Sequence, residues 1–150
     1  MTKLIRTLGT VLIPAALLLP QALRAADYGT PAEAKAMLEK AAAELKQEKP
    51  KALEMFNKGE GGFKDHDLYV FCGGPDGKFT AHPKLAGQSL KELKDKTGKA
   101  FGEEIYSVGQ EGTISEVSYM WTRPGQTEPV QKVAYVTKVG DQVCAVGYYK

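Results

Sequence analysis

Aromatic and cationic side chains gather in the last third of the sequence, in segments that alternate as strands do. Amphipathic aromatics with one or two cations line many small-molecule pockets, where a cation fixes an anionic group. The alternative is that these aromatics only pack in the core or across strands, and composition alone favours that alternative. The candidates are Tyr119, Trp121 and Arg123 at the end of one segment, Lys132 and Tyr135 in the next, and Tyr148 and Tyr149 in the last.

Strand alternation predicts how some of these side chains are arranged. Tyr119 and Trp121 are two residues apart, so a strand would place them on one face. Lys132 and Tyr135 are three apart, so a regular strand would place them on opposite faces. One of those two would then serve packing, unless a bulge re-aims it.

Residues suited to catalysis or metal binding are few. The only histidines are His66 and His82, and neither lies near a nucleophile or a second candidate metal ligand in the sequence. The run Asp65–Asp67 could suggest a metal, but a solvated loop accounts better for so short a cluster. The chain has no CxxC or CxxCH motif, no phosphate or calcium loop and no complete nucleophile elbow. The sequence therefore predicts a protein that is not an enzyme, with no cofactor and no metal site.

The first 25 residues have the three parts of a secretory signal. Lys3 and Arg6 are followed by the uncharged run Leu8–Leu19, and Ala25 offers a small residue for cleavage. The alternative, a membrane anchor, needs roughly 20 apolar residues, and this run is shorter. We therefore predict a signal peptide over residues 1–25, a single domain over residues 26–150, and a periplasmic or secreted location without membrane insertion of the mature chain.

Removal of the leader changes the charge of the protein. The full chain has 20 basic and 18 acidic residues, and three of the basic ones (Lys3, Arg6 and Arg24) lie in the leader. The remaining 17 basic and 18 acidic side chains give a formal net charge of −1. Neither nucleic acid nor an anionic membrane is therefore predicted as a partner.

Both cysteines of the chain, Cys72 and Cys144, lie in the predicted mature domain. An even pair in an exported chain favours a disulfide, and the alternative is two buried free thiols. We favour the disulfide because both residues lie in segments that should be neighbouring strands.

The N-terminal part of the domain has helical signals. Thr30 can cap a helix, with Pro31 at its first position and Glu33 completing a capping box. Pro50 should end this helix or kink it, with a second short helix after it. Apolar residues recur at helical spacing at Ala34, Met37, Leu38, Ala41 and Leu45, then at Leu53 and Phe56.

From residue 67 onward the pattern indicates strands. The expected connector holds a helical turn over Ser89–Lys94 and a short helix over Lys99–Val108. The result is an α+β fold, with N-terminal helices packed on a five-stranded antiparallel sheet. The five predicted strands are Leu68–Cys72, Lys78–His82, Thr113–Thr122, Val130–Val139 and Gln142–Tyr149.

In order and spacing, several short motifs together resemble a known family, the single Cache domain of type 2. The resemblance covers roughly residues 32–150. Its motifs are Asp67–Phe71 before a glycine turn, Ala81–Gly87, Leu93–Asp95, Gly98–Phe101, Tyr119–Trp121 before Pro124, Lys132–Val136 and Val146–Tyr149.

The resemblance implies an extracytoplasmic sensory domain that binds small ligands, often carboxylates. It implies Tyr119, Trp121, Lys132, Tyr135 and His82 as pocket residues, and Arg123 is a second candidate cation. Its strand order also makes Cys72 and Cys144 neighbours.

Two departures from the family pattern qualify the prediction. Cys72-Gly73-Gly74 stands where the family more often has a polar turn. Flanking membrane helices and a signalling module are not found, so the domain would act with a membrane receptor, kinase or transporter. The alternative is a periplasmic interaction or regulatory subunit with no small ligand.

Overall fold

The structure is a computed structural model that describes residues 28–150, so the predicted leader over residues 1–25 lies outside the described residues. Helix α1 spans Pro31–Gln47 and begins with the predicted capping box, in which Thr30 and Glu33 cap each other. It ends just before α2, Lys49–Lys58, because Pro50 fits only the first turn of a helix. None of the helices in residues 28–150 is long and apolar enough to cross a bilayer.

The sheet is antiparallel and has six strands rather than the five predicted. All five predicted strands form, and the additional one is the two-residue β1, too short to leave an alternating pattern. The order is β1-β2-β6-β5-β4, and β3 also pairs with β2. The strands are β1 Lys64–Asp65, β2 Leu68–Gly73, β3 Phe79–Ala81, β4 Ser115–Thr122, β5 Pro129–Val139 and β6 Gln142–Tyr149.

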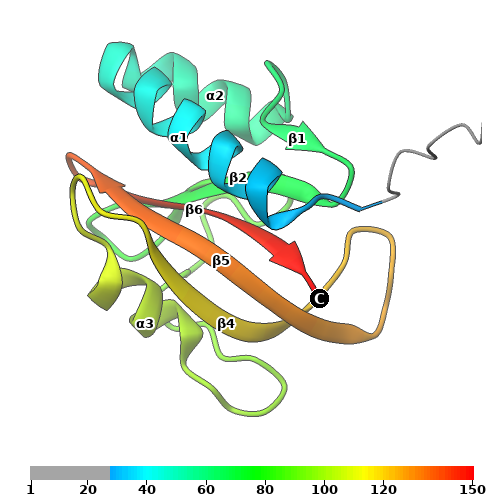
Figure 1. Ribbon diagram of the computed structural model, residues 1–150. Coiled ribbons are helices and arrows are strands. Elements are labelled where there is room, and N and C mark those ends of the chain that lie inside the picture. Colours follow the sequence, from blue (N-terminus) through cyan, green and yellow to red (C-terminus); the bar gives the residue numbers. More distant parts are fainter. Residues whose placement is uncertain (1–27) are drawn as a thin grey trace, which may run out of the picture.

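The two faces of the sheet are covered differently (Figure 1). Helices α1 and α2 pack on one face, where the core includes Leu38, Phe56 and Val70. The long connector after β3 and helix α3, Phe101–Val108, cover the other face, where the core includes Phe71 and Leu90. Because side chains alternate along a strand, each central strand contributes one set of side chains to each of the two cores.

The connector departs from the sequence prediction in one place. The expected helical turn over Ser89–Lys94 forms only as one hydrogen-bonded turn, in which Leu93 N–H bonds Leu90 O. It does not extend into a helix, because the backbone just before it pairs with the chain around β3: Phe79 N–H bonds Gln88 O and Leu90 N–H bonds Gly77 O. The predicted short helix after it forms as α3. Gly102 allows α3 to start against the connector, since a Cβ there would collide with the Leu90 carbonyl oxygen.

Cys72 on β2 and Cys144 on β6 are direct register partners and form a disulfide. Both side chains are fully buried, on the face under α1 and α2. The predicted bridge is confirmed, and it joins two central strands of the sheet.

Candidate functional site

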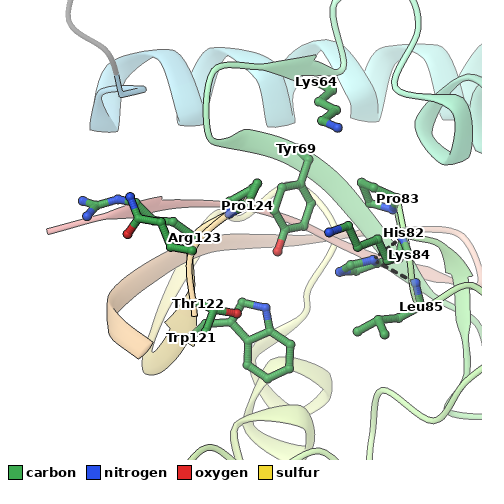
Figure 2. Close-up of a pocket in the computed structure, with 12 residues that line it drawn as sticks. Lys64, Tyr69, His82, Pro83, Lys84, Leu85, Trp121, Thr122, Arg123 and Pro124 are labelled. Atoms are coloured by element: carbon green, nitrogen blue, oxygen red, sulfur yellow. Dashed lines mark hydrogen bonds between the residues drawn. The ribbon is translucent and has the colours of Figure 1, made fainter. Parts of the chain in front are cut away.

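A cavity of about 220 Å³ opens at the sheet face covered by the connector (Figure 2). Three parts of the chain form it: β1 and β2, the turn after β3, and the end of β4 with the turn after it. It is smaller than the roughly 300–1,000 Å³ of pockets for drug-sized ligands, so its size suits a metabolite of a few carbons. Its lining residues are Lys64, Tyr69, His82, Pro83, Lys84, Leu85, Trp121, Thr122, Arg123, Pro124, Gly125 and Gln126.

Behind the cavity wall lies a buried lysine. Lys132 is 1% exposed, and its side chain lies across Gly147, where a Cβ would collide with its Cε. Its ammonium donates to the Tyr69 hydroxyl at 2.8 Å and lies over the rings of Tyr69, Tyr149 and Phe71 at 4.1, 4.9 and 5.6 Å. Tyr69 itself lines the cavity, so Lys132 reaches the cavity through the tyrosine hydroxyl.

The charge of Lys132 is not neutralised. Within residues 28–150 no carboxylate lies within 4.0 Å of its ammonium. Burying a cation without a counter-ion is costly, and aromatic faces offset only part of that cost. The site therefore holds an excess of positive charge directly behind a cavity wall.

His82 forms a second polar part of the wall. Its Nδ1 accepts the backbone N–H groups of Lys84 and Leu85 at 2.9 and 3.1 Å, which leaves the ring proton on Nε2. Burial, with smaller contributions from the charges of Lys132 and Lys84, lowers the pKa of His82 from 6.5 to about 3. The imidazole is therefore neutral near pH 7 and offers a hydrogen-bond donor at Nε2.

Aromatic rings complete the inner wall. Trp121 lines the cavity. Behind it Phe101 stacks on Tyr119, with 4.0 Å between the ring centroids, and both residues belong to the same hydrophobic core. Trp121 also lies edge-on to Phe101 at 5.4 Å, and Tyr69 is edge-on to His82 at 5.1 Å. The space behind this wall measures only about 10 Å³, so the rings leave no second chamber.

Arg123 lines the cavity, but its charge is already matched. Its Nε lies 3.3 Å from Asp67 Oδ2, and its guanidinium stacks over Tyr28 at 4.2 Å. Asp67 also accepts the Gly29 N–H at 2.7 Å, so the pair holds the N-terminal segment of the domain. Figure 2 shows the guanidinium pointing away from Tyr69 and His82. Arg123 therefore shapes the rim, while the buried cation without a carboxylate partner in the described chain is Lys132.

Tyr135 lies on the other face of the sheet. Its strand keeps a regular register, with Lys132 opposite Tyr149 and Tyr135 opposite Val146, so no bulge turns the tyrosine round. It packs against the core under α1 and its ring lies 5.8 Å from that of Tyr148. Tyr135 is thus a correction to the predicted pocket, and strand alternation is the reason.

Five predicted residues do meet at one site. His82, Trp121 and Arg123 line the cavity, while Tyr119 and Lys132 lie directly behind its wall. The other nine lining residues were not predicted, and three of them carry polar groups that matter below: Tyr69, Lys64 and Lys84. Tyr69 did leave a signal, because a tyrosine in an otherwise apolar buried strand needs a partner for its hydroxyl.

Metal ligation is not supported by the side chains of this site. Within residues 28–150, no three His, Cys, Asp or Glu side chains come together as a metal ion would require. The neutral His82 uses Nδ1 for backbone contacts. The site can donate hydrogen bonds to a ligand, and the Lys132 ammonium lies directly behind one of the donors.

Comparison with known sequences places this chain in a family. The family described as Single Cache domain 2 matches residues 24–147, so the chain belongs to it. Cache domains are extracytoplasmic sensory modules that bind ligands, and the predicted resemblance and fold are confirmed. The methyl-accepting chemotaxis protein McpP of Pseudomonas putida KT2440 is 33% identical over 75 residues, which are 48% of this chain and 14% of that protein.

Solved structures share the fold. A methyl-accepting chemotaxis protein from Vibrio parahaemolyticus RIMD 2210633 matches with a TM-score of 0.64 and 24% identity, over 79% of this chain and 86% of that one. A Cache chemosensory domain, solved as the structural basis for carboxylic acid recognition, matches with a TM-score of 0.55 and 24% identity. The match covers 77% of this chain and 84% of that domain's chain. At this identity the likeness shows the fold alone.

Proposed function

We propose that this domain senses a small carboxylic acid, bound in the cavity beside Tyr69 and His82, and that it binds without catalysing a reaction. The observation that carries the proposal is Lys132, a buried ammonium with no carboxylate near it in the described chain. A bound anion would supply the missing counter-charge. Carboxylic acid recognition by one of the structurally similar Cache domains points the same way.

In this proposal the ligand carboxylate accepts two hydrogen bonds. The Tyr69 hydroxyl accepts from Lys132, so its own hydrogen is free to be donated to the ligand. The Nε2–H of neutral His82 is the second donor. The Lys132 ammonium strengthens the hydrogen bond from the Tyr69 hydroxyl to the ligand, because a nearby charge and a low dielectric both strengthen hydrogen bonds. Trp121 would exclude water from one side of the acid.

A thermal-shift screen tests the proposal. Small carboxylic acids are compared with their primary amides, which keep shape and lose charge, because a ligand that binds only the folded state raises its stability. The best acid is then titrated by calorimetry into the wild type and Tyr69→Phe, which keeps the ring. We expect acids alone to stabilise the protein, and Tyr69→Phe to weaken binding roughly 10- to 150-fold.

Two results would contradict the proposal. If amides stabilise the protein as well as acids do, charge recognition fails. If no small acid binds, the alternative of an interaction or regulatory subunit becomes the better account. Tyr148→Phe is the matched control, since Tyr148 lies on the face under α1 and should leave affinity unchanged.

We also propose that the domain is exported and works with a membrane partner. The leader predicted over residues 1–25 supports export to the periplasm or beyond, and N-terminal sequencing of the exported protein should begin near Ala26. An intact Met1 would contradict this. The segment shared with McpP is 14% of that protein. For the chain described here we assign the path from ligand to response to a separate membrane receptor, kinase or transporter, testable by crosslinking in intact cells.

A further inference from the structure

The mouth of the cavity carries two more cations. Lys64 and Lys84 line it, and none of its lining residues is acidic. Neither lysine has a carboxylate within 4.0 Å among residues 28–150, whereas five other ion pairs form there. Figure 2 shows the Lys84 ammonium extended toward the space between Tyr69 and His82. The mouth is therefore positive, and neither ammonium is paired with a carboxylate of the described chain.

Each of these lysines is attached directly beside a residue of the inner site. Lys64 on β1 is the register partner of Tyr69 on β2, and direct cross-strand partners have Cβ atoms about 4.5–5.5 Å apart. The backbone N–H of Lys84 is bonded to the His82 ring, 2.9 Å from Nδ1. The charge of Lys84 is close enough to contribute to the lowered pKa of His82. Surface lysines are usually only solvated, but these two are anchored on either side of one opening.

We propose that the acid bound here is a dicarboxylic acid, with one carboxylate at Tyr69 and His82 and the second held at the mouth by Lys64 and Lys84. This inference rests on the proposed function and adds to it the substrate class. A cavity of about 220 Å³ suits a diacid of about four carbons, and its lining includes both the inner donors and the outer cations. Aromatic and apolar residues form the wall between the two ends, as a short carbon chain requires.

The expected preference is moderate, because both lysines are exposed and water screens their charge. Two exposed cations acting on one carboxylate should give on the order of a tenfold preference for the diacid. The preference should also shrink as ionic strength rises.

Calorimetric titration of matched acids tests this. The pairs are malonate with propionate, succinate with butyrate, and glutarate with pentanoate, which share chain length and differ in the second carboxylate. We expect at least one diacid to bind roughly tenfold tighter than its partner. In the double variant Lys64→Met/Lys84→Met we expect the ratio of diacid to monoacid affinity to fall to about one. Lys35→Met/Lys51→Met, at exposed sites on α1 and α2, is the matched control.

The outcomes separate this inference from the proposed function. Equal affinities within every pair, or tighter binding of monoacids, would overturn the dicarboxylate assignment and leave the carboxylate site standing. A diacid preference that survives in the double variant would overturn the role of Lys64 and Lys84. If no acid of either kind binds, both proposals fall together.

Discussion

Replacing Lys132 by Met should separate ligand affinity from stability. The substitution keeps an unbranched stem across Gly147 and deletes the ammonium. The folded protein would lose a charge-assisted hydrogen bond to Tyr69, worth roughly 1.5–3 kcal/mol, and cation–π contacts worth about 2 kcal/mol when desolvated. It would also be relieved of an uncompensated buried charge, whose desolvation costs several kcal/mol.

These effects on stability oppose each other, so the free energy of unfolding should fall by no more than about 1 kcal/mol. The effect on binding has one direction only. Without the cation, the acid keeps its bond from Tyr69 but loses the through-space attraction of the ammonium behind it. That attraction is roughly 1.5–3 kcal/mol for unit charges about 6–10 Å apart at an effective dielectric of about 20, which is a factor of about 10–150 in affinity.

Urea denaturation gives the stability, and calorimetric titration with the acid from the screen gives the affinity. Lys138→Met is the matched control, an exposed lysine on the same strand, and should change neither quantity. The reasoning would be refuted if Lys132→Met binds the acid as well as the wild type. It would equally be refuted if the variant loses about 3–5 kcal/mol of stability, the cost of breaking a buried ion pair, because Lys132 would then be balanced within the protein.

The disulfide, His82 and Gly147 each give a further prediction. Replacing Cys72 and Cys144 by Ala opens a loop whose ends are 72 residues apart and should cost roughly 4 kcal/mol in urea denaturation; an unchanged midpoint would contradict a stabilising bridge. Because the folded-state pKa of His82 is about 3 against 6.5 normally, the unfolded chain binds more protons between these values, so stability should fall with pH below 6.5 by up to about 1.4 kcal/mol per pH unit. In urea denaturation at pH 7 and pH 5, His82→Gln should lose less stability at the lower pH than the wild type does. An equal loss in the two proteins would contradict the assignment of His82 as a buried neutral histidine. Gly147→Ala should displace Lys132 and weaken acid binding in calorimetry, whereas wild-type affinity would show that the lysine does not need its place across the glycine.

Local signals were enough to predict most of the fold. The capping box at Thr30 and Glu33, the proline at residue 50 and the apolar spacing define the two N-terminal helices, and all of these act within a few residues. The later strands, bounded by glycine turns and rich in valine and tyrosine, form as predicted. The features that escaped prediction depend on distant partners: β1 is two residues paired with β2, and residues 87–90 pair with the chain around β3, which limits the predicted helical turn to a single hydrogen-bonded turn.

The candidate site was predicted in part for the same reason. Trp121, His82 and Lys132 were found because their residue types stand out and the family resemblance covers them. Arg123 was predicted as a candidate cation for the ligand, but it pairs with Asp67, which is 56 residues away and cannot be inferred from spacing. Tyr69, Lys64 and Lys84 become neighbours only through the pairing of β1 with β2 and the turn after β3.

The most direct test of the central claim is a crystal structure of the protein with its tightest-binding acid. Our account predicts one carboxylate in the cavity, with its oxygens about 2.5–2.9 Å from the Tyr69 hydroxyl and His82 Nε2, and with the Lys132 ammonium still bonded to Tyr69. An acid bound elsewhere on the protein, or one whose carboxylate faces away from Tyr69 and His82, would contradict it.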